Sequence, residues 1–250
     1  MNIMTKLIYL GCLSKKHYEK TCANAIRVIN YLDEQYQVID DAPCCGSLTF
    51  HYGNNEKTRN HIKYVNSWFQ YHNIDKILTI CAGCYQYLTR YYPVILGSEF
   101  NIKVEHIIQF IARPDNLKKL DLKYNGKKLK ISYHDACHLK NAIQPVIEEP
   151  RTILNSIDKI TLHAMENEKL YSICCGSGGG VYSIFKENSD FNTQTIFDQA
   201  KRAKILLTGC PFCYTAFKRV GAEINYKKTI MKFEDFIATI KFGNGGKTLE

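Results

Sequence analysis

Ten of the eleven cysteines form one pattern that occurs twice along the 250-residue chain. Each copy holds a single cysteine, then an adjacent Cys-Cys-Gly, then a Cys-x-x-Cys pair, and matching positions are offset by 125, 130 and 129 residues. The first copy comprises Cys12, Cys44, Cys45, Cys81 and Cys84, and the second comprises Cys137, Cys174, Cys175, Cys210 and Cys213. Five thiols recurring in one order predict two equivalent metal or redox sites.

The rest of the composition favours metal or redox chemistry over a disulfide framework. The first residues lack the apolar stretch and cleavage site of a signal peptide, so export is not expected. The longest apolar runs are too short to span a bilayer. In a cytoplasmic protein with Cys-x-x-Cys pairs, thiols more often hold metals or exchange electrons than form structural disulfides.

The net charge of +9 raises the question of a nucleic-acid partner. Lysines are scattered, with one denser stretch at residues 118–130, and no basic stripe interleaved with aromatic residues accompanies it. We therefore interpret this stretch as a solvated linker and expect no nucleic-acid binding. The alternative is a docking face for an acidic partner protein.

Short runs rich in strand-forming residues precede the cysteine groups. Between these runs, apolar residues recur at the spacing of a helix. The expected strands cover residues 6–10, 36–39, 77–80, 129–133, 161–165 and 205–207. The expected helices cover residues 17–34, 56–71, 150–157 and 191–203, and amphipathic stretches at 104–112 and 231–240 are expected to close each copy as core helices. This alternation predicts an α/β fold of two pseudo-symmetric halves, each a small parallel sheet with flanking helices. We expect repeats at 1–113 and 128–250, with a linker at 114–127.

Parallel strands bring distant cysteines together. In such sheets the loops that follow the strands gather along one edge, where ligands bind. All three cysteine groups of each copy follow an expected strand, so we expect them to converge. Helices starting from the same edge would help neutralise thiolates through their N-terminal N–H groups.

The thiols alone leave several kinds of site open. One four-cysteine zinc site could use Cys81, Cys84, Cys210 and Cys213, but six cysteines would then have no role. Adjacent cysteines suit a larger group with several metal atoms, such as an iron–sulfur cluster. Dithiol chemistry at a Cys-x-x-Cys that opens a helix is a further alternative. The glycine-rich run at residues 176–180 would let the backbone approach an inorganic group, or is simply a flexible loop.

The whole pattern resembles the cysteine-rich CCG domain, Cys–x(31–39)–Cys-Cys-Gly–x(about 35)–Cys-x-x-Cys. That domain occurs in duplicate in the B-type subunit of heterodisulfide reductase and in the C-terminal part of the D-type subunit. Here 31 residues separate Cys12 from Cys44, and 36 separate Cys137 from Cys174. Residues 133–139 (YHDACHL) look like the family's YHDPCHL, with Ala136 in place of proline. Residues 149–151 and 174–181 (CCGSGGGV) also look like family motifs.

The resemblance implies cofactors. In heterodisulfide reductases each complete motif holds a non-cubane [4Fe-4S] cluster through five cysteines, and the two clusters flank the disulfide. Carried over, the five cysteines of each copy are expected to bind one such cluster. Some relatives hold zinc, or nothing, in one half.

The resemblance also implies a function and partners. This sequence contains no ferredoxin-type cysteine run, so it resembles the stand-alone B-type subunit, and electrons would pass through a ferredoxin-like C-type subunit and a flavoprotein A-type subunit. The expected function is an iron–sulfur subunit that reduces or forms a disulfide in a cytoplasmic heterodisulfide-reductase-like complex. The alternative is an electron-transfer subunit of a quinone-linked dehydrogenase of the glycerol-3-phosphate or succinate type. Such a complex would dock peripherally at the membrane.

Two histidines flank the single cysteine of the second copy. His134 and His138 are candidates for hydrogen-bond donors to cluster sulfur or for proton sources to a departing thiolate. The alternative for both is a purely structural, hydrogen-bonded histidine. The eleventh cysteine, Cys22, lies on the apolar face of an expected helix and is interpreted as a core thiol.

Overall fold

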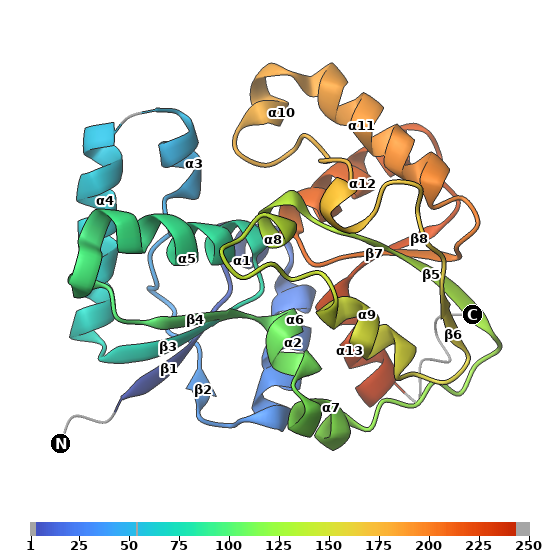
Figure 1. The fold of residues 1–250 in the computed structure, drawn as a ribbon, viewed down its shortest axis with the longest axis horizontal. Helices are drawn as coiled ribbons and strands as arrows, with labels where there is room; N and C mark the ends of the chain where they lie inside the picture. Colours follow the sequence, from blue (N-terminus) through green and yellow to red (C-terminus); the bar gives the residue numbers. More distant parts are fainter. Residues whose placement is uncertain (1–3, 54, 244–250) are drawn as a thin grey trace.

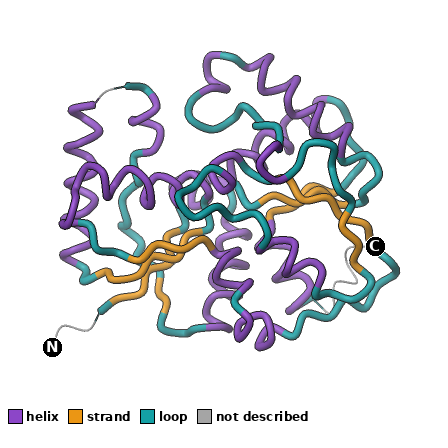
Figure 2. Tube along the Cα trace, in the orientation of Figure 1, coloured by secondary structure: helices purple, strands orange, loops and turns teal. Residues whose placement is uncertain are grey.

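The computed structural model describes residues 4–53 and 55–243, which form two four-stranded sheets, all of whose strands are parallel. Figure 1 shows the halves side by side, and Figure 2 shows their strands as two separate groups with helices between and around them. The first sheet has the order β2-β1-β3-β4, and the second has the matching order β6-β5-β7-β8. The strands are β1 (Thr5–Tyr9), β2 (Tyr36–Gln37), β3 (Ile74–Thr79), β4 (Lys103–His106), β5 (Leu129–His134), β6 (Ile160–Leu162), β7 (Ile205–Thr208) and β8 (Thr229–Lys232). The predicted α/β fold of two pseudo-symmetric halves is confirmed.

Helices connect successive parallel strands in both halves. The first half contains α1 (Cys12–His17), α2 (Glu19–Leu32), α3 (Ser47–His51), α4 (Asn55–Tyr71), α5 (Ala82–Leu96), α6 (Ile107–Ala112) and α7 (Pro114–Leu120). The second contains α8 (Cys137–Lys140), α9 (Glu149–Asn155), α10 (Val181–Ile184), α11 (Lys186–Gln199), α12 (Pro211–Glu223) and α13 (Phe233–Phe242). Short 3₁₀ turns cover Gly97–Glu99 and Lys169–Tyr171. No helix in these described segments is long and apolar enough to cross a bilayer.

The two closing stretches differ from the prediction. Residues 104–112 and 231–240 are not single helices, because each begins in an edge strand, β4 or β8, that turns directly into α6 or α13. Apolar residues continue from the strand into the helix, so the sequence pattern does not mark where the strand ends and the helix begins. The expected linker begins with α7, and the predicted repeat boundaries stay a prediction.

The core is continuous from one half to the other. Alternate residues of β1 point to opposite faces of the first sheet: Leu7 and Tyr9 pack with α4 and α5, whereas Ile8 joins the larger core. That larger core includes buried residues of α2, α6, α9 and α13, which lie between the two sheets in Figure 1. Asp235, at the start of α13, also accepts hydrogen bonds from Thr21 and Asn24 of α2 at 2.7 and 2.8 Å.

Truncating a side chain in this shared core should destabilise the whole molecule. Ile29 of α2 is completely buried, and we expect Ile29→Ala to lower the free energy of unfolding by about 2–5 kcal/mol, through lost burial and the cavity left behind. Denaturant unfolding of the purified protein measures this. Val94→Ala, at an exposed position of α5, is the control and should leave the midpoint unchanged; equal effects would contradict the shared core.

Candidate metal centre

The five cysteines of the first half meet where the strands end. Cys12 opens α1, Cys81 caps the N-terminus of α5, and Cys84 lies in its first turn. The Sγ atoms of Cys44 and Cys12 are 3.5 Å apart, and those of Cys45 and Cys84 are 3.4 Å apart. These five thiols line one hollow, together with Phe212 from the second half.

The second half repeats this arrangement. Cys137 opens α8, Cys210 caps α12, and Cys213 lies in its first turn. The Sγ atoms of Cys174 and Cys137 are 3.6 Å apart, and the thiol of Cys175 is hydrogen-bonded to that of Cys213. Each Cys-x-x-Cys pair therefore contacts cysteines of its own half, which does not support one zinc site shared between the two pairs. Among the residues described, no group of three or more His, Cys, Asp or Glu side chains is arranged to hold a single metal ion.

Backbone geometry explains the glycine of each Cys-Cys-Gly. Gly46 and Gly176 have φ angles of 83° and 67°, which L side chains rarely adopt. A Cβ atom at Gly46 would lie 2.5 Å from the ring of His61, and one at Gly176 would lie 3.0 Å from the Cα of Ser189. These neighbours hold the loops: His61 Nε2 lies 2.7 Å from the carbonyl oxygen of Cys44, and Ser189 donates to that of Cys175 at 3.0 Å.

The crowded thiols share protons unequally. Hydrogen bonds from neighbouring thiols lower the pKa of Cys44 and Cys174 to about 2. Hydrogen bonds between the two thiols of each Cys-x-x-Cys pair likewise lower the pKa of Cys81 and Cys210. Hydrogen bonding and burial raise the pKa of the remaining six: Cys12, Cys45, Cys84, Cys137, Cys175 and Cys213. Cysteines bind metals as thiolates. In each half, a group bound by all five cysteines would therefore displace protons from the three whose pKa is raised. The all-sulfur donor set around one hollow fits a cluster held by thiolates.

The structure separates the two candidate histidines. His134, at the end of β5, is completely buried near Ser172, and burial lowers its pKa to about 4. His138 lies 3.9 Å from the thiol of Cys137, measured from its Nδ1. Burial lowers the pKa of His138, but a hydrogen bond to Cys210 and the thiolate charges outweigh burial and raise it. His138 therefore retains a proton more readily than His134.

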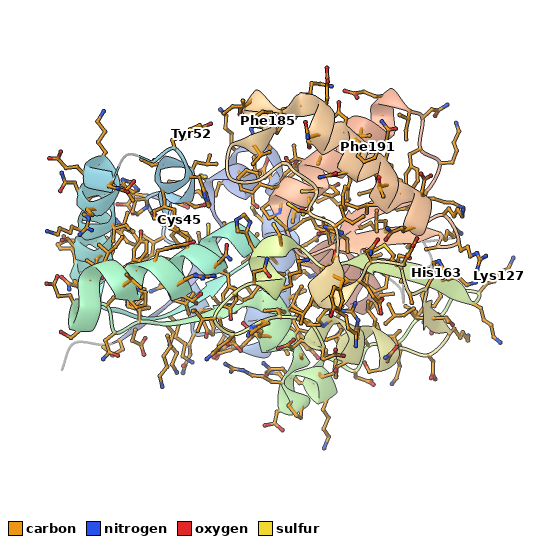
Figure 3. The ribbon with its side chains drawn as sticks, turned by 45° about the horizontal axis from the view of Figure 1, so that its top comes forward. Cys45, Tyr52, Lys127, His163, Phe185 and Phe191 are labelled. Carbon is orange, nitrogen blue, oxygen red and sulfur yellow. The ribbon has the colours of Figure 1, made fainter. Side chains whose placement is uncertain are left out.

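The loops that follow the adjacent cysteines meet across the halves. A Cβ atom at Gly180, the residue before α10, would lie 2.9 Å from the hydroxyl of Tyr52, which follows α3. The rings of His51 and His138 are 6.1 Å apart. Tyr52 and Phe185 are exposed on the same side of the molecule in Figure 3. The loops of the two halves therefore lie against each other on this side of the molecule, with Tyr52 and Phe185 exposed beside them.

Four residues near the sites were not predicted from the sequence: Gly11, His106, Lys232 and Glu234. Gly11 has a φ of 76°, and its hydrogen faces the thiols of Cys81 and Cys84. The only sequence signal for the other three is that Phe-Ile-Ala occurs at residues 110–112 and again at 236–238. This offset of 126 residues pairs position 106 with position 232. Cys22 is buried, and burial raises its pKa to about 11, which confirms its prediction as a core thiol.

Comparison with known proteins agrees with this geometry. The profile of the CCG cysteine-rich domain matches residues 7–89 and 131–218, which is more than half of the chain. The chain belongs to the CCG family. Its two copies of the domain match the two sheets and their cysteine groups.

Several curated relatives of this CCG protein are named as oxidoreductases or as subunits of them. It is 31% identical over 217 residues to the D-type subunit of the dihydromethanophenazine:CoB–CoM heterodisulfide reductase of Methanosarcina acetivorans, covering 82% of this chain and 51% of the relative. It is 31% identical to the B-type subunit of the fumarate reductase (CoM/CoB) of Methanothermobacter marburgensis, over 84% of this chain and 41% of the relative. It is 26% identical to the EtfAB:quinone oxidoreductase of Syntrophomonas wolfei, over 84% of this chain and 30% of the relative. The chain spans about half or less of the length of these relatives. They support an oxidoreductase subunit with iron–sulfur clusters.

Adding one methyl group beside the first site should impair it selectively. We expect Gly11→Ala to lower the metal content of the first half, because its Cβ would lie 3.1 Å from the Cβ of Cys81 and 3.2 Å from the Sγ of Cys84. Gly97→Ala is the matched control, since Gly97 also has a positive φ but has nothing within 4 Å. Both should lose about 1–3 kcal/mol of stability through backbone strain. Metal analysis distinguishes them, and equal metal contents would contradict the close approach.

Proposed function

We propose that this protein is the iron–sulfur subunit of a heterodisulfide-reductase-like complex that reduces or forms a disulfide at two non-cubane [4Fe-4S] clusters. The observation that supports this most directly is the convergence of two complete five-thiol sets, one in each half. The similarity to the D-type subunit of a heterodisulfide reductase supports the same conclusion.

In this proposal, Cys12, Cys44, Cys45, Cys81 and Cys84 hold one cluster, and Cys137, Cys174, Cys175, Cys210 and Cys213 hold the other. Reduction of a disulfide consumes two electrons and two protons, breaks the S–S bond and yields two thiols. Bound clusters would supply the electrons, one from each site. The chain's own part is to place both sites at facing strand ends and to exclude water around the buried thiols.

His138 is our candidate for a proton source. It lies between the thiols of Cys137 and Cys210, and the raised pKa favours its protonated form. His134 would instead act as a neutral, structural neighbour, because burial lowers its pKa. His138 would donate one of the two protons that the product thiols require.

A second candidate function is electron transfer within a quinone-linked dehydrogenase. The similarity to an EtfAB:quinone oxidoreductase and to a probable glycolate oxidase iron–sulfur subunit of Bacillus subtilis favours it. In both functions the protein would act with partners: a ferredoxin-like subunit and a flavoprotein subunit in the first, and a dehydrogenase at the membrane in the second. Anaerobic assays with a disulfide and with a quinone as electron acceptor discriminate between the two.

The content of the sites tests the proposal first. Protein purified without oxygen should contain about eight iron and eight sulfide per chain, as two four-iron clusters require. Iron, sulfide and zinc analysis measures this. Stoichiometric zinc without iron would refute the cluster assignment and favour a structural scaffold.

Single cysteine variants test the ligands. Cys175→Ala should remove the second cluster and about half of the iron, abolish turnover, and leave the first cluster's spectrum and the fold intact. Cys22→Ala is the matched control, because Cys22 is a buried thiol outside both sets. Unchanged spectra in Cys175→Ala would contradict the assignment of this ligand.

Removing the proton source should slow turnover without loss of metal. We expect His138→Gln to lower the rate of disulfide reduction by about 100-fold, as for loss of a general acid, while both clusters remain bound. His17→Gln, an exposed histidine, is the control. Equal rates for both variants would show that His138 is structural.

A further inference from the structure

Lys232 is a completely buried lysine between the two cysteine groups. It ends β8, and its Nζ donates to the carbonyl oxygens of Ile80 at 3.2 Å and Gly209 at 3.4 Å. Ile80 directly precedes Cys81, and Gly209 directly precedes Cys210. One ammonium group thus holds the backbone ahead of the Cys-x-x-Cys pair in both halves.

The two carbonyl groups occupy equivalent places. Ile80 follows β3 and Gly209 follows β7, and both strands are central in their sheets. The counterpart of Lys232 in the first half is His106, which ends β4 and is also completely buried. Burial and the charge of Lys232 lower the pKa of His106 to about 3, so that ring is neutral. These two equivalent positions therefore hold one cation instead of two.

The charge of Lys232 is maintained despite its burial. Burial by itself lowers the pKa of this lysine, but the charge of the neighbouring Glu234 opposes burial and raises the pKa. The carboxylate of Glu234, also completely buried, lies 3.0 Å from Nζ. Buried ion pairs give little or no net stability compared with apolar residues of similar size. Net stability is therefore a weak explanation for this pair.

We propose that Lys232 is a positioning residue shared by both cluster sites. It fixes the backbone that precedes Cys81 and Cys210, and its single positive charge raises the reduction potentials of both clusters together. The part concerning potentials rests on the proposed function, because it requires clusters in both halves. A nearby cation stabilises the more negative, reduced form of a cluster.

Redox titration followed by spectroscopy tests this in the anaerobic, cluster-loaded protein. Lys232→Met should weaken electron binding at both clusters about tenfold, which corresponds to about 59 mV per one-electron step. Glu234→Gln removes the opposite charge and should shift both potentials in the positive direction at pH 8, above the pKa of about 7 that burial gives Glu234. Cys45→Ala and Cys175→Ala, each expected to lack one cluster, assign the signals.

Lys140 provides the matched control. It is a second buried lysine, and its Nζ donates to the carbonyl oxygens of Leu170 and Ser172, both in the second half. Lys140→Met should leave the first cluster's potential unchanged. A shift of only one cluster in Lys232→Met, or of neither, would overturn the proposal.

The double variant Lys232→Met/Glu234→Leu covers the case in which the single variant does not fold, because an apolar pair leaves no unpaired buried charge. Because it removes one charge of each sign, its readout is hydrogen exchange and not the reduction potential. It should speed hydrogen exchange at residues 81–85 and 210–214 in both halves. If the protein holds no clusters, the proposed function fails, and this exchange measurement still tests the positioning role. Unchanged exchange in both segments would then overturn it.

Discussion

The convergence of ten thiols depends on the directions of two parallel sheets. Every cysteine group follows a strand, and the carboxyl ends of β3 and β7 approach closely enough for one lysine to bond both. Helices α5 and α12 start at these ends, so their first turns present thiols and backbone N–H groups to the same region. Cysteine groups more than thirty residues apart in the sequence become neighbours, because the loops that follow parallel strands all lie at the same edge of the sheet.

Much of this was accessible from the sequence. The doubled spacing indicated two sites, and strand-forming runs before each cysteine group predicted the parallel sheets and their shared edge. The short strands β4 and β8 were not predicted, because their apolar residues merge into the helices that follow. Gly11 and Lys232 were missed for another reason: their roles depend on which side chains approach them across the fold, and local spacing contains no such information.

The two halves share a backbone plan but differ around their thiols. His138, whose raised pKa distinguishes it, stands beside Cys137, whereas the residue after Cys12 is Leu13. Gly11 precedes Cys12 with a positive φ, whereas Ala136 precedes Cys137 in an extended conformation. Two equal sets of five cysteines are thus placed in unequal surroundings. Two such sites can differ in affinity for electrons and in access to protons.

The continuous core makes each half depend on the other. A single half would expose the apolar sides of α2 and α6, which the other half covers in this chain. In a symmetric pair, any residue near the axis occurs twice, and two lysines at the place of Lys232 would repel each other. Within one chain the two equivalent positions are free to differ. Position 106 is a neutral histidine and position 232 a lysine, an unequal pair that no symmetric dimer of identical subunits can form.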